Sequence, residues 1–377
     1  MFSHSKHIVQ RMCSFMDSNL INLFRDFIND DDLIYTMYHD CDGKNKWNII
    51  CSSMDWIEVA IDGINPKQLS FKNDNASSIK FMSFVMCVDL LWEAIKQLHR
   101  VIFNTASIPF KNEKGIFKSN QFSSSDNTYF KTVRACFAAH PVNIHDYFSS
   151  SENKERRYAS WSGGGFRGKS FSVILYSNIP DKEDFLFDIN PDELIRFAEK
   201  RYQYIYTLMG EIARQKEAFI ARFKALHIPR SNVPLEQINI LIAESHKRTN
   251  NSYYSFELKK LQLVFGTSIT STKNLSVVNQ YREALVPEVE ELFQALQNME
   301  FKELESEDHT DFSLPSSCRY DFSKLCEHVF GDGYCFRPNI QSLKDALWTT
   351  VNLDEIGSYE EMYVVVLSGF FVMNGDT

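Results

Sequence analysis

The stretch DNTYFKTVRACFAAHPVNIHD, residues 126–146, decides the interpretation of the N-terminal part of the chain. It follows a Ser-rich loop, so Ser125 or Asp126 can cap the start of a helix. It ends at Pro141, which disfavours helical geometry at the residue before it. The stretch therefore predicts one helix that closes at about residue 140.

One side of this predicted helix is apolar. At about 3.6 residues per turn, Arg134 falls at one edge of the apolar face and His140 falls near the other. The apolar positions are Phe130, Val133, Cys136 and Phe137. An Arg and a His on the rim of an apolar face predict that the face packs on another helix and that the two polar groups meet in a cleft.

The spacing Arg134-x5-His140 resembles the R-x4–6-H motif of HEPN domains. This helical family contains many metal-independent ribonucleases of toxin–antitoxin and antiviral systems. The resemblance covers residues 1–150 and implies a helical bundle with the motif near its end. It also implies that two chains pair and that their motifs form one composite site. Ala135 departs from the family pattern, which commonly has a polar residue after the Arg.

The two motif residues have the chemistry that metal-free RNA cleavage requires. RNA supplies its own nucleophile, the 2′-hydroxyl, so the site needs only proton transfer and charge stabilisation. A His titrates near pH 6.5 and can move that proton, while an Arg offers a permanent planar cation to a phosphate. We therefore predict that Arg134 and His140 are catalytic, and that Lys131 and Asn143 position a backbone phosphate.

A Gly-rich segment gives a second candidate contact with phosphate. Residues 156–177 predict a β-hairpin whose tip carries Arg167 and Lys169, the most basic local feature of the chain. Gly163–Ser170 also matches the phosphate-loop pattern G-x4-G-K-S, which needs a strand before it and a helix after it. The residues after Lys169 are β-branched and aromatic, so a hairpin is favoured and a nucleotide site is the alternative.

Composition limits the class of protein. Among 377 residues, 44% are hydrophobic and 24% are charged, as in an ordinary globular protein. The net charge of −9 argues against a general nucleic-acid coat protein, so RNA contacts must be concentrated locally. No apolar run is long enough to span a bilayer and no signal peptide is indicated, so we predict a cytoplasmic protein with no membrane contact.

Helical periodicity continues through most of the chain. It predicts a mainly α fold with three parts: an N-terminal HEPN-like bundle over residues 1–150, a basic hairpin and linker over 151–189, and a helical region over 190–377. The helices are expected at residues 6–29, 47–61, 78–103, 126–140, 190–226, 234–248, 253–264, 273–300 (kinked at Pro287), 339–349 and 358–372. The ligand types in Cys318, Cys326, His328 and Cys335 allow zinc, but no short ligand spacing supports it, so no metal or other cofactor is predicted.

The sequence thus favours a metal-independent endoribonuclease, of the kind that acts as a toxin or antiviral effector. The expected partners are RNA and a second copy of the chain, docked through the face with Phe130, Val133 and Phe137, with an inhibitory or sensor protein as a further candidate. Two alternatives stay open: a nucleotide hydrolase that uses Gly163–Ser170, and a helical scaffold without catalytic activity.

Overall fold

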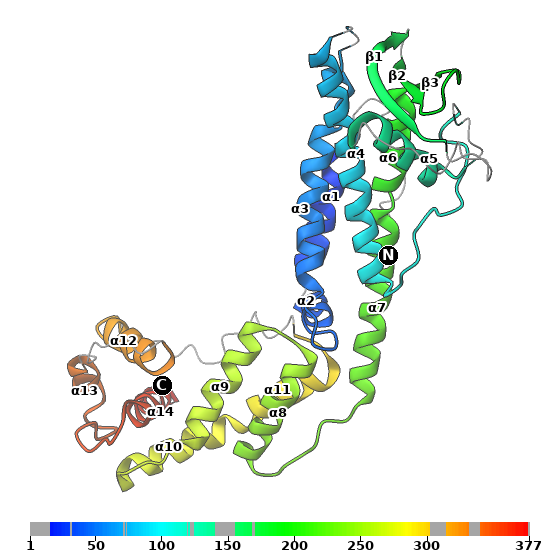
Figure 1. Ribbon diagram of the computed structural model, residues 1–377. Coiled ribbons are helices and arrows are strands. Elements are labelled where there is room, and N and C mark those ends of the chain that lie inside the picture. The colour runs from blue at the N-terminus through cyan, green and yellow to red at the C-terminus, as the bar shows by residue number, and fades with distance from the viewer. Residues whose placement is uncertain are drawn as a thin grey trace, which may run out of the picture. The chain divides into compact units, whose positions relative to one another are not determined.

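The computed structural model describes residues 16–30, 32–70, 72, 74–118, 120, 124–139, 155–167, 170–301, 314–331 and 340–375, with backbone alone at 139, 162–167 and 375. Their contacts divide the chain into two compact units, residues 1–216 and 217–377. Figure 1 shows helices in both units and one small sheet in the first. The mainly α fold with a hairpin is confirmed. The predicted boundaries at 150 and 189 stay a prediction, although the sheet and the helix after it lie in the first unit.

The first unit is a helical bundle that carries the sheet. Its helices are α1 (Ser18–Asn29), α2 (Asp32–His39), α3 (Trp47–Gly63), α4 (Asn75–Ile102), α5 (Asp126–Arg134), α6 (Pro191–Tyr202) and the first part of α7 (Ile205–Ala225), with a short 3-10 turn at Pro66–Gln68. A five-residue π-helical segment, Ala135–Ala139, continues α5.

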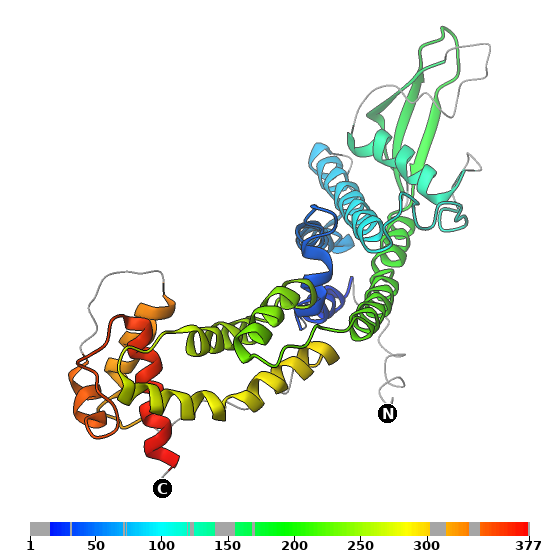
Figure 2. The same cartoon turned by 90° about the horizontal axis from the view of Figure 1, so that it is seen from below.

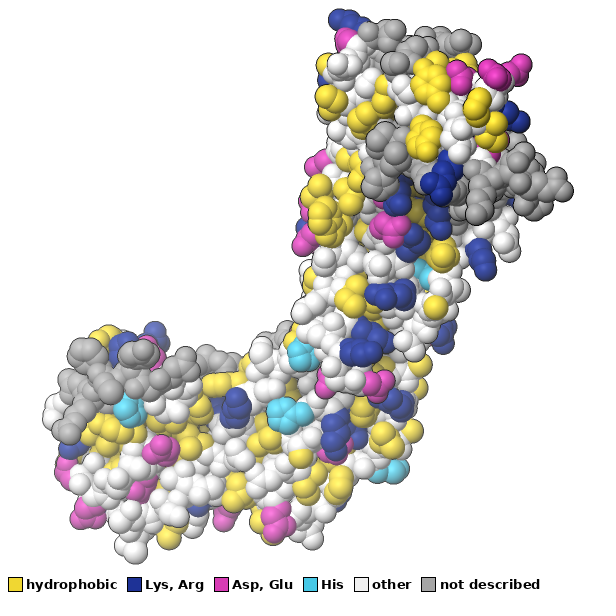
Figure 3. Space-filling view, viewed as in Figure 1, with side chains coloured by type: hydrophobic (Ala, Val, Ile, Leu, Met, Phe, Trp, Pro, Cys, Tyr) yellow, Lys and Arg dark blue, Asp and Glu magenta, His cyan; other side chains and the backbone are white. Residues whose placement is uncertain are grey.

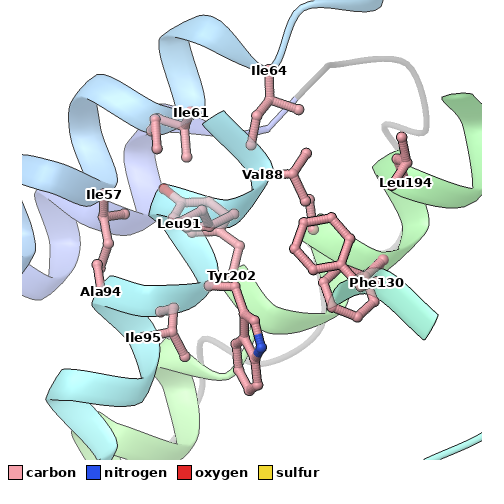
Figure 4. Close-up of a cluster of buried hydrophobic side chains, with 14 of the residues drawn as sticks. Ile57, Ile61, Ile64, Val88, Leu91, Ala94, Ile95, Phe130, Leu194 and Tyr202 are labelled. Atoms are coloured by element: carbon pink, nitrogen blue, oxygen red, sulfur yellow. The ribbon is translucent and has the colours of Figure 1, made fainter. Parts of the chain in front are cut away.

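The core of this unit forms around α4, because α4 is apolar on most of its sides. Figure 4 shows Leu91 and Ile95 of α4 facing Ile57 of α3, with Leu194 of α6 nearby. The cap that begins α4 is Asp74, whose side chain accepts a hydrogen bond from the backbone of Ser77 at 2.7 Å. At about 1.5 Å per residue the 28 residues of α4 extend roughly 42 Å, which makes it the central element of the bundle.

The sheet is antiparallel, with strand order β1 (Arg157–Arg167), β2 (Ser170–Ser177), β3 (Phe185–Ile189). β1 and β2 form the predicted hairpin, with Arg167 opposite Ser170 at its tip. The third strand was not predicted. One side of the sheet joins the helical core: Phe171 of β2 stacks on Phe81 of α4 with 3.8 Å between ring centroids. Figure 2 shows the sheet beside α4, α5 and α6.

The second unit is helical throughout the part of it that the structure describes. Its helices are α8 (Pro234–Arg248), α9 (Ser252–Gly266), α10 (Thr272–Ala284), α11 (Val286–Asn298), α12 (Arg319–Phe330), α13 (Gln341–Leu347) and α14 (Tyr359–Gly375). The buried Arg248 of α8 donates hydrogen bonds to the carbonyls of Phe223 and Leu226, at 2.9 and 2.8 Å, and so caps the last turn of α7. No helix among the described residues of either unit has the length and apolar character needed to cross a membrane.

Three differences from the predicted helices have physical causes. The helix predicted at residues 6–29 is followed by α2, which was not predicted and which begins at Asp32, where an acidic residue suits the first turn. The predicted helix 190–226 is broken at Gln203 and Tyr204, where Tyr204 turns to contact His99 of α4. α12 was not predicted at all. The predicted kink at Pro287 separates α10 from α11, as expected for a Pro in a first helical turn.

Candidate functional site

Arg134 is the last residue of α5, and local sequence fixes the position of that helix. Ser125 is its cap and accepts a hydrogen bond from the backbone of Thr128 at 3.3 Å. Phe130 stacks on Phe197 of α6 with 4.6 Å between ring centroids, which holds the apolar side of α5 inside the bundle. Arg134 is left at the edge, with 40% of its side chain exposed.

A carboxylate on α4 holds the guanidinium of Arg134. Nη1 of Arg134 donates to Oδ2 of Asp89 at 2.9 Å. Asp89 is 8% exposed, and this burial raises its pKa above the ordinary value, while the hydrogen bond and charge of Arg134 act in the opposite direction. Nε of Arg134 is buried without a hydrogen-bond partner, so the terminal nitrogens are the donors that a ligand can reach.

The backbone changes its winding immediately after Arg134. Ala135–Ala139 is π-helical, a geometry that is rare and frequent at functional sites. The segment still buries Cys136 and Phe137, so it remains part of the core. His140 and Asn143 lie outside the described residues, and their positions relative to Arg134 stay a prediction.

Further charged residues lie on the two helices of the ion pair. Lys131, one turn before Arg134 on α5, is exposed. On α4, the spacing of Asp89, Glu93, Lys96 and Arg100 places these residues along one side of the helix, and Lys96 ion-pairs with Glu93. Figure 3 shows dark blue side chains along the region that α4, α5 and α6 occupy in the same view. A chain with net charge −9 thus has cations on both helices that form the ion pair.

The hairpin does not support a phosphate-loop site. The backbone of Arg167 lies in β1, its side chain is not described, and Lys169 lies outside the described residues. Strand β2 begins at Ser170, where the phosphate-loop mechanism requires a helix N-terminus. A strand at this place argues against the alternative of a nucleotide hydrolase built on Gly163–Ser170. Arg157, at the base of the hairpin, has a structural role, because it is buried and pairs with Glu155 at 2.7 Å.

The face predicted to bind a second copy is covered by the chain itself. Phe130, Val133 and Phe137 are each no more than 1% exposed. Phe137 contacts the rings of Phe81, Trp161 and Phe187, which come from α4 and the sheet. The sequence showed that this face packs on another surface, but it did not show that the surface belongs to the same chain. Docking of a second copy through this face is therefore excluded.

Cys318 and His328 of the second unit have packing and hydrogen-bond contacts within the fold. Cys318 is buried and its thiol lies 3.4 Å from the carbonyl of Ser342. His328 packs on the ring of Tyr359 with 4.2 Å between centroids. Cys335 lies outside the described residues. Within the described ranges, no group of three His, Cys, Asp or Glu side chains is placed to hold a metal ion.

Two polar groups of the first unit were missed from the sequence. One is Asp89, whose signal was a lone carboxylate inside the apolar run FVMCVDLLW. The other is His99, which is buried in the last turn of α4. Its Nδ1 contacts the hydroxyl of Tyr204 at 3.0 Å and its Nε2 contacts that of Ser107 at 3.2 Å. Burial lowers the pKa of His99, so its imidazole is neutral at neutral pH.

No protein-family model, curated protein or solved structure matches this chain. A guanidinium that is half exposed, oriented by a buried carboxylate and flanked by Lys131 is suited to bind an oxyanion such as a phosphodiester.

Proposed function

We propose that this protein is a metal-independent endoribonuclease of the HEPN kind, acting as a toxin or antiviral effector. The observation that carries the proposal is the placement of Arg134 at the end of a helix, six residues before His140, where Asp89 orients the guanidinium at 2.9 Å. Arg134 would stabilise the charge that builds on the phosphate in the transition state. His140 would move the proton of the 2′-hydroxyl or of the leaving oxygen.

The cations on α4 and α5 provide the contacts that hold the substrate. Lys131, Lys96 and Arg100 would bind backbone phosphates, which fixes an RNA strand without selecting its sequence. Binding through phosphates releases counterions, so affinity should fall steeply as salt rises. Arg167 and Lys169 at the hairpin would extend this contact as accessory residues.

The test is RNA cleavage in the presence of a metal chelator, with Arg134→Ala compared against Arg196→Ala. Arg196 of α6 is a matched control because it is also an arginine and half of its side chain is exposed. Loss of the Arg134 charge should lower the rate about 10²–10³-fold, as for one removed oxyanion donor. Arg196→Ala should retain most of the rate. Cleavage that stops in the chelator, or that survives Arg134→Ala, would contradict the proposal.

A second copy of the chain is also part of the proposal, but through a different face from the one predicted. A groove of about 420 Å³ lies between α3 and α4, lined by apolar side chains such as Trp56, Leu90 and Ala94 and by polar ones that include Glu93 and Gln97. Trp56 is 51% exposed, and Val59 and Met86 are exposed near it on the same two helices. Exposed apolar surface of this kind marks interaction sites. Leu90 directly follows Asp89 on α4, so the groove lies on a neighbouring side of the helix that holds the Arg134 site.

Light scattering measures this association directly. The chain should have twice its own mass at micromolar concentration, and Trp56→Glu should return it to a monomer without unfolding it, because half of the indole is already in water. Met373→Glu, at an exposed apolar residue of the second unit, is the control and should leave the mass unchanged. A wild-type monomer that still cleaves RNA would refute the dimer while the nuclease proposal stands.

A further inference from the structure

Asp89 is a buried carboxylate on a helix whose other buried residues are mostly apolar. It lies in the middle of α4, between residues that are almost fully buried, such as Val88 and Leu91. Its side chain reaches the rim of the bundle and meets Arg134 there, across 45 positions of sequence. The next charged residue on α4 is Glu93, which ion-pairs with Lys96 at 2.5 Å. The cation that Asp89 pairs with is Arg134.

The donors of Arg134 are divided between the protein and solvent. Nη1 is bonded to Asp89, and Nε is buried without a partner. Because the side chain is 40% exposed, the outward donors belong to its terminal nitrogens. One carboxylate contact on Nη1 thus fixes the plane of the guanidinium and leaves an outward edge for a phosphate. Without that contact, a long side chain at the end of a helix would sample several rotamers.

Stability alone does not explain the pair. Burial of Asp89 disfavours its charged form, and the opposing effect of Arg134 is too small to cancel it, since the pKa is raised. A partly exposed Arg is also hydrated well without a partner, so the pair adds little to the folding free energy. Groups that cost stability are commonly kept where a site needs a fixed geometry.

We infer that Asp89 is the positioning residue of the Arg134 site: it holds Nη1 so that the outward edge of the guanidinium meets the scissile phosphate of an RNA strand. The inference rests on the proposed nuclease function and names the residue on which the geometry of that site depends. Asp89 touches neither the substrate nor the reacting atoms, so it acts only through Arg134.

The experiment compares Asp89→Asn with Asp55→Asn in cleavage kinetics and in thermal unfolding. Asp55→Asn is the matched control, because it is the same substitution in an aspartate that also pairs with an arginine, Arg25 at 2.8 Å, on another helix of the first unit. Asp89→Asn should lower kcat about 10²-fold, as expected when a catalytic group is misplaced by about 1 Å, with KM changed much less. Its unfolding temperature should equal or exceed that of wild type. Asp55→Asn should alter neither kcat nor the unfolding temperature, because its carboxylate is exposed.

A double variant separates positioning from other effects. In an Arg134→Ala background, Asp89→Asn should cause no further loss of kcat, because the group it positions is already absent. Full activity of Asp89→Asn in a chain that needs Arg134 would overturn the inference and leave the nuclease proposal intact. A lowered unfolding temperature with unchanged kcat would assign Asp89 a structural role only and overturn it as well. If wild type does not cleave RNA, the nuclease proposal itself has failed.

Discussion

Substitution of Phe137 by Ala tests whether the apolar face of the α5 region belongs to the core of one chain. Phe137 is 1% exposed and contacts three other rings, those of Phe81, Trp161 and Phe187, at centroid distances of 5.5 to 5.6 Å. Phe→Ala in a core costs about 3–5 kcal/mol, and aromatic pairs add about 0.5–1.5 kcal/mol each beyond area burial. Three such pairs place the expected loss in the upper part of the range, at about 4–5 kcal/mol.

Urea unfolding followed by Trp fluorescence is a suitable assay, because Trp161 lies against Phe137. With a slope of about 2–3 kcal/mol per molar urea, the loss lowers the midpoint of the first unit by about 1.3–2.5 M. The same substitution at Phe256 of the second unit is the control: Phe256 is 45% exposed, so the loss should stay below about 2 kcal/mol. A loss below about 1 kcal/mol at Phe137, together with weaker self-association, would restore the face as a dimer interface and refute this reasoning.

Two further predictions concern stability. Burial lowers the folded-state pKa of His99, so the unfolded chain binds the proton more readily than the folded chain. The contribution of the neutral imidazole to the free energy of unfolding is therefore complete above about pH 6.5 and should fall as the pH drops below that value. His99→Gln should flatten the fall that thermal unfolding records between pH 7 and 5.5, and an unchanged slope would contradict the burial of the imidazole. Arg201→Met should cost about 1–3 kcal/mol in urea unfolding, because it removes the fully buried guanidinium that pairs with Glu113 and donates to Asn127, each at 2.9 Å, while Lys200 still pairs with Glu113. Addition of Glu113→Gln should recover part of that loss, and no recovery would contradict the pairing.

The fold class followed from patterns that local chemistry determines. Helical periodicity predicted α3, α4 and α8 within a few residues, and Asn190 with Pro191 marked the start of α6 because both suit a helix N-terminus. The β-branched run after Lys169 predicted β2 for the same kind of reason. The break between α6 and α7 could not be predicted in this way, since it depends on contacts of Tyr204 with α4.

Only part of the candidate site could be predicted from the sequence. A motif spacing identified Arg134, because residues on one helix have a fixed angular relation. Its partner Asp89 comes from another helix, and only packing brings the two together. The same limit explains the error about the dimer face: periodicity shows that Phe130 and Phe137 are covered, and only the fold shows that α4, α6 and the sheet cover them.

The central claim is that the 2′-hydroxyl of RNA is the nucleophile at the Arg134–His140 site. The most direct test uses one RNA oligonucleotide and its copy with a single deoxyribose at the scissile position, both in a metal chelator. The account predicts that the RNA is cut to a 2′,3′-cyclic phosphate, that the copy resists at that position, and that His140→Ala slows the RNA reaction about 10²–10⁴-fold. Equal cleavage of both oligonucleotides, or full activity of His140→Ala, would contradict it.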